Sequence, residues 1–257
     1  MNLLLLFPED FENDVRAVVD GRRAHHVKRI LRAARGDELC VGVVDGRIGT
    51  GTIAEDPGRE LVLDVRLEHD PPPALPVVLV LALPRPPVLG RVLAAATSFG
   101  VKQIVLLHTR RVEKTYWQAS ALEPEALREK LVLGLEQGRD TVLPTVALQR
   151  RFRPFVENEL PSLLSGAHGV FAHPLDAAEA ARPDRTGTSG TSVGAGHGIE
   201  LQTPAVVAIG PEGGFLDHEV EHLQAAGMQA VSLGPRALRV ETAAAALLGR
   251  FRQAALR

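Results

Sequence analysis

The stretch of sequence that decides the fold reads Ala205-Val206-Val207-Ala208-Ile209-Gly210-Pro211-Glu212-Gly213-Gly214-Phe215, an apolar run that stops at a loop rich in glycine. A continuous apolar run is typical of a strand buried on both faces of a parallel sheet. Residues 170–172 stop in the same way at His173-Pro174, and residues 231–233 stop at Gly234-Pro235. Ligands of open α/β sheets bind beyond the carboxyl ends of the strands, where glycine lets them reach the backbone. We therefore predict a ligand site at these three strand ends.

Apolar runs and amphipathic stretches alternate on both sides of this segment. Strands are expected at residues 77–83, 103–108, 142–148, 169–172, 205–209 and 230–233, and helices at 87–99, 124–137, 152–164, 217–226 and 238–253. Such alternation predicts an α/β domain with a mostly parallel sheet. Residues 177–203 interrupt the pattern, and their Gly/Ser/Thr-rich centre, 186–196, is expected to be a surface insertion whose deletion leaves folding and activity nearly intact.

Residues 1–72 have a different character and are expected to form a small β-rich domain. The β-prone runs 38–44 and 48–54 flank Asp45-Gly46, a pair that favours a hairpin turn, and residues 61–67 alternate as a further strand. One helix is expected at 24–34, with Val27, Ile30, Leu31 and Ala34 on its apolar side. Three prolines at 71–73 form a stiff spacer, so the domain boundary is predicted there, with residues 73–257 as the second domain.

Composition indicates a cytoplasmic protein. The chain has 257 residues, 45% hydrophobic and 23% charged, which is enough for a packed core. The single cysteine, Cys40, has no internal partner, as expected in a reducing compartment. The apolar start lacks a basic flank and ends at Pro8, so it predicts a strand and no signal peptide. No window reaches the roughly twenty apolar residues of a membrane span.

Basic residues gather near the N-terminus although the net charge is −2. Between Arg16 and Arg35 lie seven basic residues and one acid, Asp20. Such a patch can neutralise phosphates, and the alternative is an ordinary solvated helix face.

Two motifs in the second domain carry a family resemblance. Residues 209–215, Ile-Gly-Pro-Glu-Gly-Gly-Phe, resemble the loop of the same sequence in the RsmE family of the SPOUT superfamily. Residues 233–243, Leu-Gly-Pro-Arg-Ala-Leu-Arg-Val-Glu-Thr-Ala, are similar to that family's Leu-Gly-x-Arg-Ile-Leu-Arg-x-Glu-Thr-Ala, in the same order and spacing. Residues 25–37 resemble the His…Val-Leu-Arg…Gly-Asp segment of its PUA-like N-terminal domain, and Glu136-Gln137 is similar to its Glu-Gln-Ser stretch.

The resemblance implies a knotted SPOUT methyltransferase domain after a PUA-like RNA-binding domain. It implies a homodimer that uses S-adenosylmethionine, without a metal, to methylate N3 of a uridine in 16S ribosomal RNA of the small subunit. The implied cofactor contacts are Phe171, His173, Ile209, Gly210, Pro211, Gly213, Gly214, Leu233, Gly234 and Leu238. The expected RNA contacts are Arg22, Arg23, His26, Lys28, Arg29, Arg32 and Arg111.

Uridine N3 carries a proton and lies on the Watson–Crick edge, so the base must be unpaired or turned out before transfer. Arg239 is expected to stabilise negative charge that develops on the uracil oxygens. Glu212 and Glu241 are candidates to pair with an arginine or to accept a proton. For Glu241 the alternative is a carboxylate that stabilises the first turn of a helix.

Departures from the family pattern leave other functions open. Residues 94–100, Ala-Ala-Ala-Thr-Ser-Phe-Gly, stand where the family usually has Lys-Ala-Thr-Glu-Leu-Gly, Arg111 lacks the usual following Ser, and Ala237 replaces Ile. The early Arg of the family is also absent, so no catalytic role is carried over from it. The alternatives are a catalytically weak or inactive rRNA-binding protein and a SPOUT enzyme that acts on another RNA.

Two formal motif matches point elsewhere and fail on context. Residues 218–222 read His-Glu-Val-Glu-His, the zinc-protease pattern, but Val220 and Leu223 of the same helix are needed for packing. Residues 49–54 match a dinucleotide fingerprint, but Glu55-Asp56-Pro57-Gly58 follows instead of a helix.

Overall fold

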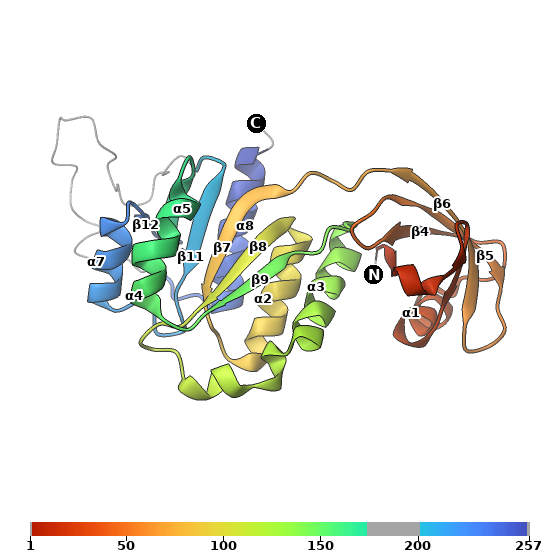
Figure 1. The fold of residues 1–257 in the computed structure, drawn as a ribbon, viewed down its shortest axis with the longest axis horizontal. Helices are drawn as coiled ribbons and strands as arrows, with labels where there is room; N and C mark the ends of the chain where they lie inside the picture. Colours follow the sequence, from red (N-terminus) through yellow and green to blue (C-terminus); the bar gives the residue numbers. More distant parts are fainter. Residues whose placement is uncertain (1, 174–200, 256–257) are drawn as a thin grey trace. The chain divides into compact units, whose positions relative to one another are not determined.

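The computed structural model describes residues 2–173 and 201–255, which form two compact units (Figure 1). One unit comprises Met1–Pro73 and Arg128–Leu143, and the other comprises Ala74–Leu127 and Pro144–Arg257. The chain therefore divides after Pro73, and residues 128–143, expected in the second unit, belong to the first. The insertion centred on 186–196 lies outside the described residues.

The first unit is built on a six-stranded sheet with the order β1-β4-β5-β6-β3-β2. Its strands are β1 (Leu4–Leu6), β2 (Phe11–Asn13), β3 (Arg16–Val19), β4 (Glu38–Val43), β5 (Ile48–Glu55) and β6 (Leu61–His69). β1 runs parallel to β4, and the other neighbours are antiparallel. The predicted hairpin around Asp45-Gly46 is present, whereas β2 and β3 were not expected.

The N-terminal leucines explain why residues 128–143 belong to the first unit. Successive side chains of a strand point to opposite faces. Leu4 and Leu6 accordingly enter the core of the sheet, while Leu3 and Leu5 pack against Val132 and Leu135 of α3 (Pro124–Gly138). The backbone N–H groups of Asn2 and Leu3 also donate to the carbonyl of Glu136. This apolar start is therefore a strand buried on both faces.

The predicted helix at 24–34 is wrong in its geometry. The chain forms α1 (Gly21–His25) and then a π-helical turn, η2 (His26–Leu31), which ends at Arg32 with a φ of 56°. A π turn bonds residue i to i+5 and so rotates later side chains away from α-helical positions. Val27 is buried as expected, but Ile30 and Leu31 are 63% and 48% exposed.

The second unit is a six-stranded parallel sheet with the order β12-β10-β11-β7-β8-β9, which confirms the predicted α/β class. Its strands are β7 (Leu75–Ala82), β8 (Val101–Leu107), β9 (Thr145–Gln149), β10 (His168–Ala172), β11 (Ala205–Ile209) and β12 (Gln229–Val231). The sequence order jumps between neighbours, so several connections must cross over the sheet.

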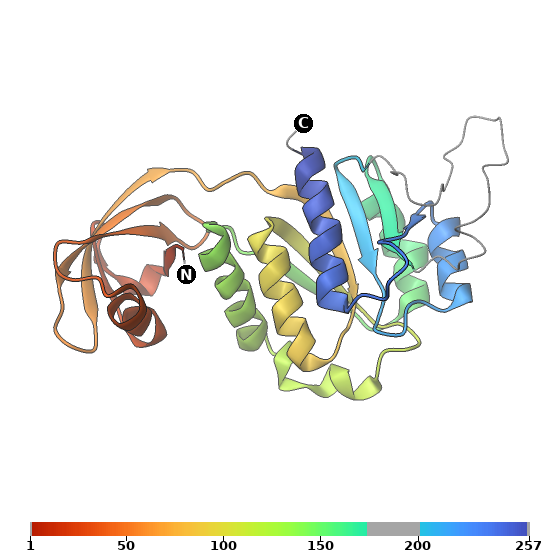
Figure 2. The same cartoon turned by 180° about the vertical axis from the view of Figure 1, so that it is seen from behind.

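Helices cover both faces of this sheet. α2 (Pro86–Ser98) and α8 (Val240–Ala255) pack together on one face (Figure 2). The other face carries α7 (Asp217–Ala225) and a continuous helical stretch made of α4 (Phe152–Pro154), the π turn η5 (Phe155–Glu159) and α5 (Leu160–Leu164) (Figure 1). Short 3-10 turns, η3 (Lys114–Gln118) and η4 (Ser120–Leu122), precede α3.

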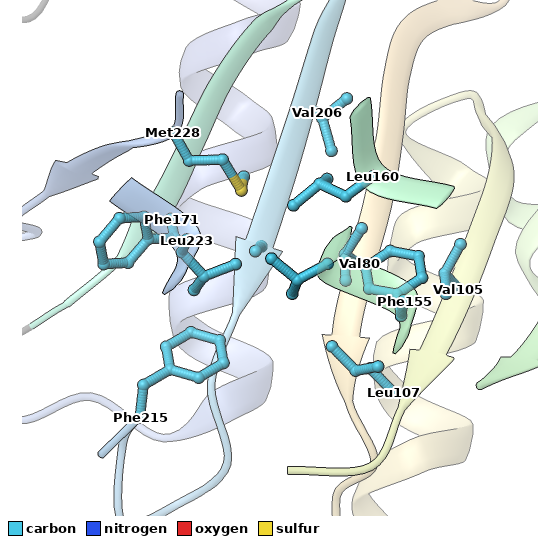
Figure 3. Packing of buried hydrophobic residues seen from close by; sticks show 12 residues of the cluster. Val80, Val105, Leu107, Phe155, Leu160, Phe171, Val206, Phe215, Leu223 and Met228 are labelled. Carbon is cyan, nitrogen blue, oxygen red and sulfur yellow. The ribbon is translucent and has the colours of Figure 1, made fainter. Parts of the chain in front are cut away.

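A buried apolar cluster packs between the sheet and the helices on one of its faces and includes a residue of the loop after β11. Val80, Phe155, Phe171 and Phe215 pack together within it, and the rings of Phe171 and Phe215 meet edge to face with centroids 6.2 Å apart (Figure 3). Edge-to-face pairs are a favoured aromatic geometry. The loop after β11, which holds Phe215, is therefore anchored to the core.

Among the helices of residues 2–173 and 201–255, none combines the length and the apolar character that a membrane crossing requires.

Candidate functional site

The predicted ligand site at the three strand ends is a cavity of about 340 Å³ in the second unit. Its walls come from the ends of β10, β11 and β12 and from the start of α8. The lining residues are Ala172, His173, Ile209, Gly210, Pro211, Glu212, Gly213, Gly214, Val231, Leu233, Gly234, Pro235, Arg236, Ala237, Leu238, Val240 and Ala243. This volume is within the usual range of small-molecule sites, roughly 300–1,000 Å³.

All but one of the predicted cofactor residues line this cavity. The exception is Phe171, whose ring is fully buried in the apolar cluster and supports Phe215. The prediction for Phe171 is corrected for a simple reason: alternate residues of a strand face opposite sides, and its side chain faces the core. That the other residues bind a cofactor stays a prediction.

Sequence reasoning missed several lining residues, of which Arg236 is the most informative. Its side chain is exposed at the cavity, and it lies between Gly234 and Leu238, two residues that were predicted. The motif at 233–243 contains both arginines, but only the second, Arg239, was predicted as a site residue. Arg239 is exposed at the start of α8, and its carbonyl accepts from the N–H of Ala243, but it does not line the cavity.

A tight turn shapes the glycine loop. The N–H of Gly214 donates to the carbonyl of Pro211 at 2.8 Å, and Gly214 has a φ of 74°, which side chains rarely adopt. A Cβ atom on Gly213 would lie 3.0 Å from Cδ of Arg111. A side chain on Gly213 would therefore have to displace the exposed side chain of Arg111 slightly.

One residue of the cavity lining, His173, has a buried polar atom without a partner in the described part of the chain. Nδ1 of His173 is buried and has no hydrogen-bond partner among the described residues, although the backbone N–H of His173 donates to the carbonyl of Val231. Buried polar groups are nearly always hydrogen-bonded in folded proteins. A nucleoside-type ligand, which combines an apolar base face with polar edges, fits this wall of backbone, apolar carbon and imidazole.

Each of the two predicted catalytic carboxylates is paired with an arginine. Glu212 lines the cavity, and its Oε1 lies 3.3 Å from Nε of Arg85. Glu241 lies outside the cavity lining, in the first turn of α8, where it accepts from Arg91. Of the two, only Glu212 could reach a bound ligand in this arrangement.

Side chains of the zinc-protease pattern at 218–222 make hydrogen bonds to backbone groups. Glu219 is 1% exposed, and its two oxygens accept from the backbone N–H groups of Arg110 and Leu216, each at 2.8 Å. Nδ1 of His222 lies 2.6 Å from the carbonyl of His218. This glutamate therefore holds two backbone segments and has no free oxygen for a metal-bound water.

Protonation of the His108 imidazole is disfavoured. Nε1 of Trp117 donates to Nδ1 of His108 at 2.8 Å. Burial lowers the pKa of His108, and the charge of Lys114 lowers it further. His108 is therefore held as a neutral imidazole just beyond the end of β8.

The first unit divides the predicted RNA contacts into two groups. Arg22 forms a bidentate pair with the buried Glu136, with distances of 2.9 and 2.8 Å. Arg23 binds Asp10 and the carbonyl of Leu5, and Lys28 binds Asp56 and two backbone carbonyls. These three side chains are engaged in intramolecular pairs, Arg22 while still exposed and Arg23 and Lys28 while largely buried, and that they contact RNA stays a prediction.

The remaining cations of this segment are available to a partner. Arg29, Arg32 and Arg35 are exposed. His26 is mostly buried, with an unpartnered Nε2 and a pKa lowered by burial, so it is a poor phosphate contact. Fewer of these cations are therefore free of intramolecular pairs than the sequence suggested.

Fold and site together define a parallel-sheet enzyme with a ligand cavity beyond its strand ends. The model of the RNA methyltransferase domain family matches residues 71–252, and the chain belongs to that family. It is 30% identical over 249 residues to "Ribosomal RNA small subunit methyltransferase E" of Treponema pallidum, covering 96% of this chain and 88% of that protein. The protein of the same name from Mycobacterium tuberculosis is 29% identical over 238 residues, covering 91% and 84%.

Solved structures support the fold. The structure of "a Ribosomal RNA small subunit methyltransferase E from Neisseria gonorrhoeae bound to S-adenosyl methionine" superposes with a TM-score of 0.66. The match covers 98% of this chain and 97% of that chain at 19% identity.

Proposed function

We propose that this protein transfers a methyl group from S-adenosylmethionine to N3 of a uridine in 16S ribosomal RNA. The observation that carries the proposal is the cavity at the ends of β10, β11 and β12, which gathers nine of the ten predicted cofactor residues. The relatives in Treponema pallidum and Mycobacterium tuberculosis support it: both are named as methyltransferases of small-subunit ribosomal RNA, and both match nearly the whole chain.

The cofactor, when bound, would supply a methyl group bonded to a sulfonium sulfur, so that a nitrogen nucleophile could take the methyl carbon while the neutral thioether leaves with the electron pair of the broken C–S bond. The backbone of the Gly210–Gly214 loop and the apolar carbons of Leu233 and Leu238 would hold the nucleoside part. Holding two reactants in a near-attack geometry is the main contribution that such a site can make.

The acceptor nitrogen must lose its proton as the new bond to carbon forms. Arg239, which is exposed at the start of α8 and follows the cavity-lining Leu238, would stabilise negative charge on the uracil oxygens. Glu212 lies at the cavity and is held by Arg85, so it can orient a polar group of either reactant. The proton acceptor is not assigned to a residue.

The first unit contributes affinity for RNA in this proposal. Arg29 and Arg32 flank the exposed side chains of Ile30 and Leu31. Cations beside exposed apolar carbon suit a partner with phosphates and base faces, as a ribosomal RNA has. The same proposal includes four properties that the family resemblance implies. They are a PUA-like role for this unit, a knot around the cofactor, a homodimer and a cytoplasmic location.

Two measurements in sequence test the proposal. Calorimetric titration of the purified protein with S-adenosylmethionine should give one site per chain. A transfer assay on small ribosomal subunits, followed by nucleoside analysis, should then yield 3-methyluridine. Binding with a different methylated nucleoside would keep the cofactor and change the substrate. Absence of binding would favour an rRNA-binding protein without activity.

A further inference from the structure

The loop after β8 and the loop after β11 are joined by contacts that no motif assigned. In the sheet order, β7 separates β8 from β11, so these loops reach each other over the end of β7. The contacts come from adjacent residues of the first loop, Arg110 and Arg111, and from Glu219 of α7. All of them lie within the second unit.

Arg111 contacts the glycine loop through its side chain. Its Nη1 donates to the carbonyl of Gly213 and lies 3.4 Å from the carbonyl of Gly214. Its Cδ lies 3.0 Å from the position that a Cβ atom on Gly213 would take. The guanidinium therefore lies against the turn and contacts two successive carbonyls.

Glu219 contacts both loops through their backbones. Oε1 accepts from the N–H of Arg110, and Oε2 accepts from the N–H of Leu216, just before α7 begins. Because the carboxylate is almost completely buried, losing either contact would leave a buried polar group unpaired. This glutamate fixes the distance between the two loops.

We infer that Arg111 and Glu219 are positioning residues that hold the glycine loop in its ligand-binding shape, and that Arg111 serves this purpose and not RNA contact. The inference rests on the proposed function, since the ligand in question is S-adenosylmethionine. Gly213 and Gly214 lack side chains and have wide backbone freedom, so contacts from outside the loop add to the hold of Phe215 and of the Pro211–Gly214 turn. The clamp lowers the conformational entropy that ligand binding would otherwise have to remove.

The neighbouring arginine provides a matched control. Arg110 is exposed like Arg111, but it enters the clamp only through its backbone N–H, and its side chain makes no hydrogen bond or ion pair with the described residues. Arg111→Ala and Arg110→Ala therefore remove the same charge from adjacent positions. A phosphate contact made by Arg111 predicts that Arg111→Ala loses more RNA affinity than Arg110→Ala, whereas a clamp predicts that the two variants differ only in their affinity for the cofactor.

The experiment measures S-adenosylmethionine affinity by calorimetry and 16S RNA affinity by filter binding for both variants. For Arg111→Ala we expect the cofactor Kd to rise about 10-fold or more, as for loss of a hydrogen bond to a charged group, while Arg110→Ala stays within about twofold. The RNA Kd should be equal for the two variants. Arg111→Lys, which can still donate to one carbonyl, should recover part of the affinity.

A second readout needs no cofactor. Hydrogen exchange of the ligand-free protein should be faster at the amides of Gly214 and Leu216 in Arg111→Ala than in Arg110→Ala, with unchanged melting temperatures. Glu219→Gln should accelerate the same amides, with Glu221→Gln, an exposed neighbour on α7, as its control.

The outcomes separate this inference from the function. If the wild-type protein does not bind the cofactor, the proposed function fails, and the exchange rates still decide whether the clamp exists. If the wild type binds, and Arg111→Ala binds equally well with unchanged exchange, the clamp is refuted. A loss of RNA affinity in Arg111→Ala alone would return this residue to the RNA surface.

Discussion

Nη2 of Arg91 on α2 lies 3.0 Å from Oε1 of Glu241 in the first turn of α8. The pKa of Glu241 is lowered, first by a hydrogen bond from its own backbone N–H and then by Arg91 and Arg239. The carboxylate is thus a stable anion at the positive end of a helix dipole, and it joins two helices that pack on the same face of the sheet. Of the two interpretations of Glu241 that the sequence left open, the structure favours the structural one.

Glu241→Gln should therefore leave methyl transfer nearly unchanged. We expect kcat within about threefold of the wild type, because exposed ion pairs contribute little. The melting temperature should fall slightly, and Arg91→Ala should reproduce that fall. The measurement is a single-turnover transfer assay beside thermal denaturation. A loss of kcat of several hundredfold, with the fold intact, would restore Glu241 as a proton acceptor.

The two arginines of the motif at 233–243 should differ in what they affect. Arg236 lines the cavity, so Arg236→Ala should raise the cofactor Kd with a smaller effect on the rate at saturation. Arg239→Ala should lower the rate, by about 100-fold or more if it acts like a donor to a developing oxyanion, and leave cofactor affinity nearly unchanged. Calorimetry and single-turnover rates on both variants make the comparison. Equal loss of both properties in Arg239→Ala would move it into the cofactor site.

The sequence predicted the second unit well because its information is local. Buried parallel strands appear as short apolar runs, and the ends of β10, β11 and β12 are marked by proline or glycine, so their convergence follows from the fold class alone. Phe171 was misassigned because a strand written as letters does not show which face each side chain takes.

The first unit was predicted less well because its determinants are distant in sequence. β2 and β3 are short, and β3 is ordered by pairing with β6, more than forty residues away. The sequence likewise does not show that Arg23 pairs with Asp10 or that Arg22 pairs with Glu136. A cluster of basic letters shows charge, but it does not show which charges folding has already neutralised.

The RNA surface can be tested through its salt dependence. Arg29→Ala and Arg32→Ala should each weaken 16S RNA binding. Each should also reduce the steepness of the plot of log K against log salt by about 0.7 to 0.9, because binding with one phosphate contact fewer releases fewer counterions. Glu38→Gln, which removes a charge from another exposed position of the first unit, is a control that should not reduce the slope. Slopes unchanged in both arginine variants would remove the basic segment from the interface.

Acid should destabilise the protein partly through His108. Its pKa is lowered in the folded state by burial, so below about pH 6.5, the unperturbed histidine value, the unfolded chain binds more protons than the folded one. Stability therefore falls as the pH drops through this range and is fully present above it. His108→Gln should flatten the loss between pH 7 and 5, measured by urea denaturation at each pH. An equally steep loss in the variant would exclude His108 as a contributor.

Arg23 should matter for folding and not for RNA. Its guanidinium binds Asp10 and the carbonyl of Leu5, with 13% and 8% of the Arg23 and Asp10 side chains exposed, and it also lies 5.0 Å from the ring of Phe7. Arg23→Ala leaves the Asp10 carboxylate buried without its cation, which typically costs about 3 to 5 kcal/mol. Chemical denaturation should show that loss in the first unit. Arg23→Ala/Asp10→Asn should recover part of it, because the double change removes the uncompensated charge. If Arg23→Ala instead left stability unchanged and weakened RNA binding as much as Arg29→Ala does, the ion pair would be incidental and Arg23 would belong to the RNA surface after all.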